Sequence, residues 1–152
     1  MDRQWAIEQL LPGEAALWLS MSGPDRRHSV GVARRTAAML GPRAERPVLA
    51  AALVHDSGKT ISGLRTTGRV VATVMGVVVG HDQRRAVRWS AARWPRRPIG
   101  QYWRHPELGA ELLTSLGSDP LTVTWAREHH LGAAGCSLDP EIADALRRAD
   151  DD

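Results

Sequence analysis

The chain has 152 residues, a length that suits one hydrophobic core, because single domains most often have about 100–150 residues. Hydrophobic residues make up 43% of the sequence and the formal net charge is +3, a balance that excludes an intrinsically disordered chain. Cys136 is the only cysteine, which excludes an intrachain disulfide and fits a reducing cytoplasm. We therefore expect one folded domain over residues 1–152.

The sequence offers no candidate for membrane insertion. Its first residues lack a basic segment followed by an apolar signal core. The longest apolar run, residues 70–79, is about half the length of a membrane-spanning helix. We therefore expect a soluble, cytoplasmic protein without a membrane partner.

Four helices are predicted in the first third of the chain, and glycine- or proline-containing pairs separate them. They cover residues 2–11, 13–21, 25–40 and 47–56. Asp25 is the expected cap of the third helix, which places His28 in its first turn. The fourth helix begins at Pro47 and is apolar until it reaches His55 and Asp56.

Residues 70–79 are rich in valine, which favours a strand, although the length and context also fit a buried helix. We favour the helix, because an isolated strand would leave its backbone groups unpaired and no other segment is a convincing strand partner. Residues 83–97 predict an amphipathic cationic helix that Pro95 ends. We interpret its arginines as a solvated face, so nucleic-acid binding is possible but not favoured.

Three further helices are predicted over residues 106–116, 119–130 and 140–150. Pro106 suits the first turn of one of them, and Asp119 suits the cap of the next. The predicted fold is therefore all-α, a single compact helical bundle.

Five of the six histidines lie on or beside predicted helix ends: His28, His55, His105, His129 and His130. Imidazole and carboxylate groups bind divalent ions such as Zn, Fe and Mn when several converge from different helices. A lone histidine is more often an ordinary surface or core residue. The ordered set, together with Asp56 and an aspartate near residue 150, predicts a metal site.

This order resembles the HD-domain superfamily of metal-dependent phosphohydrolases over residues 25–151. The resemblance rests on the following motifs: Arg27-His28-Ser29, the apolar run into His55-Asp56-Ser57-Gly58-Lys59, His105-Pro106-Glu107-Leu108-Gly109, Glu128-His129-His130 and Ala149-Asp150. The pair His81-Asp82 lacks the apolar lead-in and the following Gly-Lys, so we interpret it as a surface or loop feature.

The resemblance implies one divalent metal ion held by His28, His55, Asp56 and Asp150. The additional histidines are similar to those of dinuclear members, in which Asp56 would bridge to a second ion held by His105, His129 and His130. The implied metals are Fe, Mn, Mg, Co or Zn. Asp151 is a rival to Asp150 as the last ligand. No Gly-Tyr-Pro follows His130, so cyclic-di-GMP is not supported as the substrate.

The expected reaction is hydrolysis of a phosphate ester of a nucleotide or small phosphorylated metabolite by a metal-bound hydroxide. Besides Asp56, Lys59 is expected to be catalytic by contacting a phosphate oxygen. Arg27 and Arg104 each precede a candidate ligand and could also bind phosphate. Glu128 could orient a ligand.

Two other functions fit the same residues. One is a di-iron oxygenase of the HD type that acts on a polyol or phosphonate, since histidine and carboxylate ligands serve both chemistries. The other is a non-catalytic regulatory module that binds a metal or a nucleotide. The sequence leaves the oligomeric state open.

Overall fold

The computed structural model describes residues 2–64, 66–80 and 82–151, so His81 of the second His-Asp pair lies outside the described residues. Within these ranges the chain forms α-helices and short 3-10 helices without a strand, which confirms the predicted all-α fold. The elements are α1 (Asp2–Glu8), α2 (Pro12–Ser20), α3 (Gly23–Leu40), η1 (Gly41–Arg43), α4 (Arg46–Val54), η2 (Ser57–Thr60), α5 (Thr66–Val79), α6 (Gln83–Ser90), α7 (Arg96–Trp103), α8 (His105–Ser115), α9 (Pro120–Glu128), η3 (Ala133–Gly135) and α10 (Pro140–Asp151).

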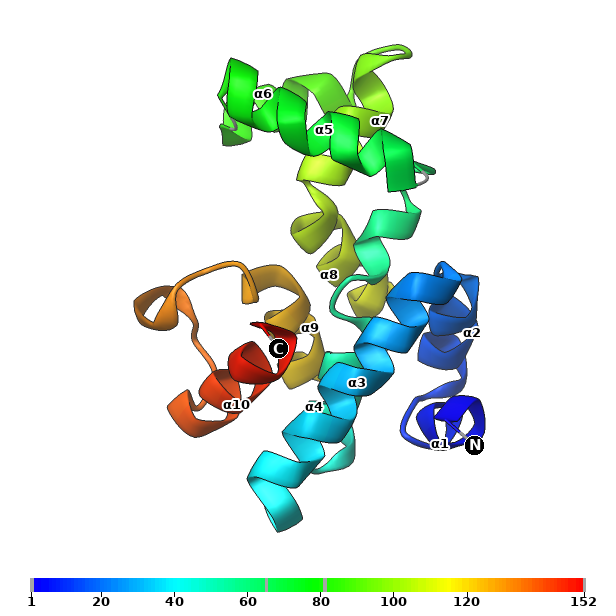
Figure 1. Ribbon diagram of the computed structural model, residues 1–152, viewed down its shortest axis with the longest axis vertical. Helices are drawn as coiled ribbons and strands as arrows, with labels where there is room; N and C mark the ends of the chain where they lie inside the picture. The colour runs from blue at the N-terminus through cyan, green and yellow to red at the C-terminus, as the bar shows by residue number, and fades with distance from the viewer. Residues whose placement is uncertain (1, 65, 81, 152) are drawn as a thin grey trace.

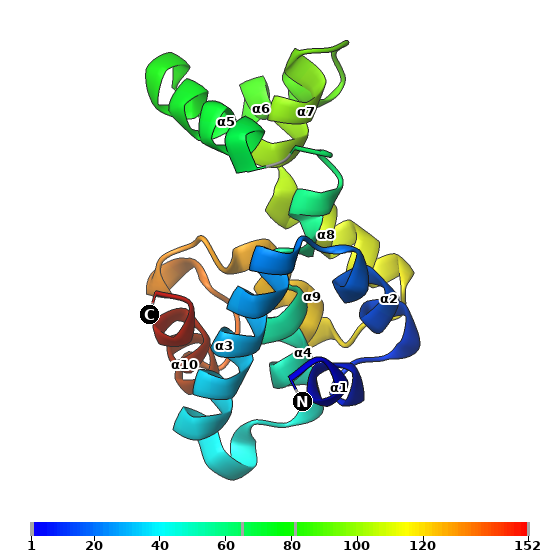
Figure 2. The same ribbon diagram turned by 45° about the vertical axis from the view of Figure 1, so that its right-hand side comes forward.

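The helices are arranged as a main bundle with three helices at one end of the long axis (Figures 1 and 2). Helices α1 to α4 and α8 to α10 form the main bundle, and α5, α6 and α7 pack together beyond it. The turn η2 and helix α8 lie where the two parts meet. None of the described helices is both long and apolar enough to cross a membrane.

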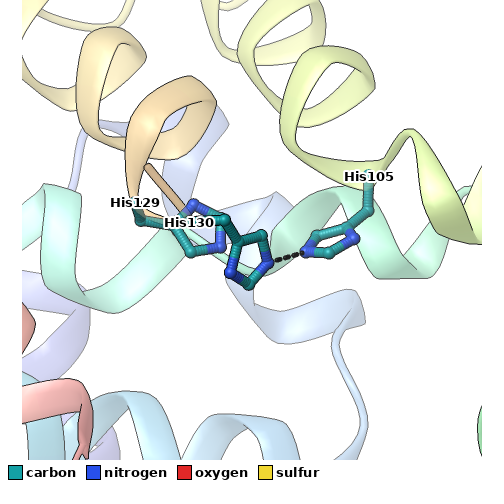
Figure 3. Close-up of side chains that lie close together, drawn as sticks. All are labelled: His105, His129 and His130. Carbon is teal, nitrogen blue, oxygen red and sulfur yellow. Dashed lines mark hydrogen bonds between the residues drawn. The ribbon is translucent and has the colours of Figure 1, made fainter. Parts of the chain in front are cut away.

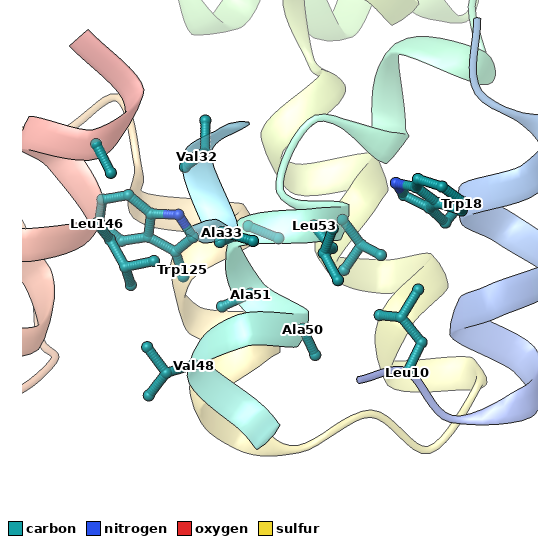
Figure 4. Packing of buried hydrophobic residues seen from close by; sticks show 14 of the residues in the cluster. Leu10, Trp18, Val32, Ala33, Val48, Ala50, Ala51, Leu53, Trp125 and Leu146 are labelled. Atoms are coloured by element: carbon teal, nitrogen blue, oxygen red, sulfur yellow. The ribbon is translucent and has the colours of Figure 1, made fainter. Parts of the chain in front are cut away.

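Helix α4 lies at the centre of the main bundle, where it packs against α2, α3 and α9. It is apolar on every side, a pattern typical of a fully buried helix. Its residues 50–54 have no exposed surface, and Trp18 and Trp125 fill the core on its two sides (Figure 4). Because α4 ends at Val54, this rigid helix delivers His55 and Asp56 to a fixed place inside the molecule.

Helix α3 begins earlier than predicted. Ser22, and not Asp25, is its cap, because the Ser22 hydroxyl accepts a hydrogen bond from the backbone N–H of Asp25 at 3.3 Å. Asp25 instead binds the guanidinium of Arg69 with both carboxylate oxygens. His28 therefore lies in the second turn of α3.

The prediction of one continuous cationic helix over residues 83–97 is wrong, because the structure has two helices in this region. Helix α6 ends at Ser90, and the unpredicted helix α7 begins at Arg96. The two pack so closely that a Cβ on Gly100 would lie 2.2 Å from the backbone nitrogen of Ser90. Gly100 therefore permits a helix–helix contact, although in the sequence it resembles a helix breaker.

Residues 70–79 form a helix, as predicted, but it is not buried. Ala72 and Gly76 face the neighbouring helices, whereas one side of α5 is a row of exposed valines. These are Val70, Val71, Val74, Val77 and Val78. Periodicity could not reveal this arrangement, because both sides of the helix are apolar.

Candidate metal centre

Seven predicted ligands come together from five helices. His28 lies on α3, His55 and Asp56 follow α4, His105 begins α8, His129 and His130 follow α9, and Asp150 lies near the end of α10. They form two groups of three with Asp56 between them. The sequence separates these residues by up to 122 positions, so only the bundle brings them together.

The first group contains three imidazoles, those of His105, His129 and His130, and we call it the imidazole group. One ring nitrogen from each lies within 4.8 Å of the others. Figure 3 shows His105 extending from the start of α8 toward the two histidines at the end of α9. The Nε2 atoms of His105 and His130 are 3.1 Å apart, close to the separation of about 3.3 Å between two nitrogens on one tetrahedral zinc.

The second group contains His28, His55 and Asp150, and we call it the mixed group because it includes a carboxylate. Its ligand atoms also lie within 4.8 Å of one another. The Oδ1 atom of Asp150 is 2.8 Å from His28 Nε2 and 3.3 Å from His55 Nε2. His55 is buried, whereas His28 is exposed, so this group opens toward solvent on its α3 side.

Asp56 offers one carboxylate oxygen to each group. Its Oδ2 atom lies 3.7 Å from His55 Nε2 and forms an ion pair with Lys59. Its Oδ1 atom lies 3.6 Å from His105 Nε2 and 3.7 Å from His129 Nε2. A carboxylate in this position can bind two cations at once, since each oxygen has its own lone pairs.

Three of the histidines are oriented in the same way. His55, His105 and His129 each direct Nδ1 at the backbone carbonyl three residues earlier, at 2.9, 2.9 and 3.0 Å. A carbonyl can only accept a hydrogen bond, so in the neutral ring Nδ1 carries the proton and Nε2 carries the lone pair. Every Nε2 lone pair then faces the centre of the site, which is the arrangement of metal-binding histidines.

A divalent metal fits this set of donors. His129 Nε2 is a buried nitrogen that, among the described residues, has no hydrogen-bond partner. The lone pair of a neutral His55 faces the carboxylates of Asp56 and Asp150, and two electron-rich groups in contact are unfavourable without a cation. A cation between these donors satisfies all of them. Imidazole with carboxylate suits Zn, Fe, Mn and Co.

The pKa of His55 in the mixed group and the pKa values of His129 and His130 in the imidazole group shift in opposite directions. Burial lowers the pKa of His129, and burial together with the neighbouring His129 and His105 lowers the pKa of His130 to about 3. Burial opposes protonation of His55 as well, but the carboxylates of Asp56 and Asp150 outweigh it and raise the pKa of His55.

The carboxylates of the site remain ionised. Burial alone would raise the pKa of Asp56, but His55, His105, His129 and Lys59 lower it well below its usual range. Burial would likewise raise the pKa of Asp150, but the hydrogen bonds from His55 and His28 lower it. Both aspartates are therefore available as anionic ligands near neutral pH.

A backbone contact fixes the position of His105 relative to His55 and Asp56. A Cβ on Gly58 would lie 2.0 Å from the carbonyl oxygen of His105, and one on Gly109 would lie 3.2 Å from the nitrogen of Gly58. The turn η2 and the start of α8 therefore touch through glycine backbones. In the sequence, Gly58 was noted only as part of the motif that follows His55 and Asp56.

Other predicted residues lie away from the ligands. Asp151 is exposed and lies beside Arg35 and Arg148, so Asp150 is the aspartate that contacts the two histidines of the mixed group. Glu128 binds the backbone N–H and hydroxyl of Ser137 and thereby closes the loop after α9. It does not contact the ring of a candidate ligand in the described structure.

The two arginines that precede candidate ligands also point elsewhere. Arg104 binds the hydroxyl of Ser90 at the end of α6, at 3.3 Å. Arg27 lines a groove beside α2 and α3. Lys59 is therefore the predicted cation that lies at the ligands, through its ion pair with Asp56.

Arg35 is a positioning residue that sequence reasoning missed. Its guanidinium donates two hydrogen bonds to the carbonyl of Ala149, at 3.0 and 2.7 Å. These bonds tie the last turn of α10 to α3, so that Asp150 meets His28. No sequence pattern distinguishes Arg35 from the chain's many other arginines.

Comparisons with protein-family models, curated proteins and solved structures found no match.

Proposed function

We propose that the protein is a metal-dependent phosphohydrolase of the HD-domain type, acting on a phosphate ester of a nucleotide or small phosphorylated metabolite. The observation that supports this proposal most strongly is the position of Asp56. One of its oxygens faces His55 and the other faces His105 and His129, and the Nε2 lone pairs of these three neutral rings point inward. Two metal ions held close together by one carboxylate suit phosphate ester hydrolysis, where both the attacking and leaving oxygens need stabilisation.

The ligands divide between two metals. His28, His55 and Asp150 would hold one ion, and the imidazole group would hold the other, with Asp56 shared. When bound, divalent ions supply a water nucleophile that is active near neutral pH and offset the negative charge of the phosphate. The net charge of the ligands partly offsets that of the ions, because Asp56 and Asp150 are both ionised.

Lys59 has the second role in the proposal. Its side chain is about one-fifth exposed, and its ammonium group lies against Asp56 Oδ2, at the edge of the ligand set. It can turn to a phosphate oxygen when the substrate arrives, because its long side chain is flexible and the carboxylate then binds metal. Lys59 thus binds and orients the phosphate, while the backbone carbonyls hold the imidazoles in the correct tautomer.

The test combines metal analysis with a phosphatase screen. Purified protein is freed of metal, loaded with Mn, Mg, Co, Fe or Zn, and its metal content per chain is measured by mass spectrometry. Hydrolysis of nucleotides, sugar phosphates and aryl phosphates is then followed by phosphate release. We expect two ions per chain and metal-dependent turnover. Absence of bound metal, or no turnover with any of the five metals, would contradict the proposal.

Lys59→Met tests the second role. We expect metal content to remain at two ions per chain, while kcat/KM falls by about 100–1,000-fold, the usual effect of removing one group that stabilises charge in the transition state. Arg104→Met is the matched control, because Arg104 is a cation next to the ligand His105 in the sequence, but its guanidinium binds Ser90. Unchanged kcat/KM in Lys59→Met would exclude its catalytic role.

A further arm separates hydrolysis from oxygenation. The iron-loaded protein is incubated with polyols and phosphonates in an oxygen electrode, alongside the phosphate screen. The hydrolase proposal expects no oxygen uptake. Substrate-dependent oxygen consumption without phosphate release would replace hydrolysis with the di-iron oxygenase function.

A further inference from the structure

A cavity of about 310 Å³ lies against the imidazole group. His105 and His130 form one side of it, so a molecule inside the cavity would lie next to the candidate metal site. The rest of the wall comes from two helices outside the main bundle, α5 and α7, through Thr73, Gly76, Val77, Tyr102 and Trp103. The cavity thus joins the metal site to the part of the chain beyond the bundle.

Two polar groups of this wall already have hydrogen-bond partners. The Thr73 hydroxyl donates to the carbonyl of Arg69 at 3.0 Å, and the Trp103 indole N–H donates to the carbonyl of Ala72 at 2.8 Å. The Tyr102 ring stacks with the His105 ring, with centroids 5.8 Å apart. None of the described lining residues is an aspartate, glutamate, lysine or arginine. The cavity therefore offers mainly methyl groups and aromatic carbon.

The mouth of the cavity is apolar as well. Val77 lines it and is 82% exposed, and it belongs to the row of exposed valines on α5. A hydrocarbon that is longer than the cavity could thus continue along an apolar surface. An ester group with many hydroxyls would lose hydrogen bonds to water and find few donors or acceptors to replace them.

Resting on the proposed function, we infer that this cavity binds the ester group of the substrate and that this group is an apolar aryl or alkyl group. The inference narrows the proposed substrates to small apolar phosphate esters and leaves nucleotides and sugar phosphates out. The volume is at the lower end of the range for small-molecule sites, about 300–1,000 Å³. About ten molecules of liquid water occupy the same volume, which is enough for a bicyclic aromatic ring or a medium alkyl chain.

The first experiment compares substrates of equal phosphate charge on the metal-loaded protein: 1-naphthyl phosphate, a series of n-alkyl phosphates, and glycerol 3-phosphate. We expect kcat/KM for the n-alkyl phosphates, which share an alkoxide leaving group with glycerol 3-phosphate, to exceed that for glycerol 3-phosphate by at least about tenfold, since each methylene in an apolar site contributes a factor of about 10–200. An equal or reversed preference would overturn the inference.

The alkyl series separates the two sources of the apolar group. If the natural substrate is an amphiphile, kcat/KM rises with chain length beyond the volume of the cavity, because the chain continues over the exposed side chain of Val77. If it is an aryl ester, kcat/KM reaches a plateau and the naphthyl ester is preferred. Both outcomes support an apolar ester group.

Variants locate the effect in the cavity. Thr73→Trp adds bulk at a lining position, and Val74→Trp is the matched control, because Val74 is the neighbouring residue, is 54% exposed and does not line the cavity. We expect Thr73→Trp to reduce the ratio of apolar to glycerol ester kcat/KM by about tenfold, with unchanged metal content. Equal ratios in the two variants would contradict the assignment.

A binding measurement tests the cavity without turnover. Uncharged 1-naphthol and 1-octanol are titrated against the protein by saturation-transfer NMR. We expect at least one to bind the wild type and Val74→Trp, and neither to bind Thr73→Trp. If neither alcohol binds the wild type, the cavity assignment fails, whether or not phosphate esters are hydrolysed. Binding of an alcohol without phosphatase activity would instead show that the proposed function alone has failed.

Discussion

The imidazole group and the mixed group lie on opposite sides of one carboxylate, yet the pKa values of His129 and His130 shift in the opposite direction from that of His55. On the imidazole side, burial lowers the pKa of His129 and His130. On the mixed side, two aspartates overcome burial and raise the pKa of His55. The nearest charges, and not burial alone, thus decide the protonation of each ring. The imidazole group should therefore favour Zn or Fe, and the mixed group should accept Mn or Mg more readily.

The largest effect is expected from Asp56→Asn, because Asp56 is shared by both groups. An amide presents one acceptor oxygen and no negative charge, so neither ion would be retained. We expect metal content to fall from two ions per chain toward none and kcat/KM to fall by at least about 100-fold, since changing groups that only orient ligands costs about 10–100-fold. A variant that keeps two ions would contradict the shared role.

Asp150→Asn should remove the metal ion from the mixed group and leave the ion of the imidazole group bound. Asp150 contacts His28 and His55 and is remote from the imidazole group in the arrangement of ligands. We expect one ion per chain, and a loss of activity of about 10–100-fold. Asp151→Asn is the control, because Asp151 is an exposed neighbour of the same charge. Loss of both ions in Asp150→Asn would show that the groups bind metal as one unit.

Acid should release metal from the mixed group first. Metal binding to His55 requires loss of its proton, and the raised pKa of His55 retains that proton to higher pH. Below that pKa we expect affinity for the mixed group to fall about tenfold per pH unit. The imidazole group should retain its ion at lower pH, since the pKa of His130 is about 3. Metal titrations between pH 5 and 8, with Asp150→Asn isolating the imidazole group, measure the difference.

Thermal unfolding of the metal-free protein gives an independent check on the direction of these shifts. The raised pKa of His55 should stabilise the fold fully below the unfolded value of about 6.5, and this contribution should disappear as pH rises through the folded pKa. The lowered pKa values of Asp56 and Asp150 should stabilise the fold above about pH 4 and lose that effect in acid. Flat stability across both ranges would contradict the assigned shifts.

The smallest effect is expected from His130→Gln. His130 retains more contact with solvent than His105 and His129, which are buried beside it. We expect metal affinity of the imidazole group to fall by about tenfold or less, with two ions still bound at saturating metal. His129→Gln is the comparison within the same group and should cost more. If His130→Gln abolishes binding, the exposed ring is as important as the buried ones.

Helices were predictable where a proline, a glycine or a capping aspartate marks their ends. Pro47 and the apolar residues after it predicted α4, and Asp119 caps α9 as expected, accepting from the N–H of Leu121. The break between α6 and α7 was not predictable, because Gly100 admits a neighbouring backbone that lies ten residues earlier in the chain. The exposure of α5 was likewise hidden, since the side that faces the neighbouring helices is as apolar as the exposed row of valines.

The candidate ligands were predictable as a set, through the resemblance, but their division into two groups depends on tertiary structure. Which oxygen of Asp56 faces which histidine follows from how α4, α8 and α9 cross, and no spacing encodes that. Arg35 and the cavity beside His130 were missed for the same reason. Arg35 acts on a residue 114 positions away, and most of the cavity wall comes from α5 and α7, which bear no motif.

The contact of Gly58 with the start of α8 has a mechanical consequence. Because the main chains meet there without intervening side chains, a change of rotamer cannot adjust the distance between the backbone of His55 and Asp56 and that of His105. It can change only if η2 and α8 slide past each other as whole elements. The backbone therefore sets the distance between the two sides of the centre, and the surrounding side chains have little influence on it.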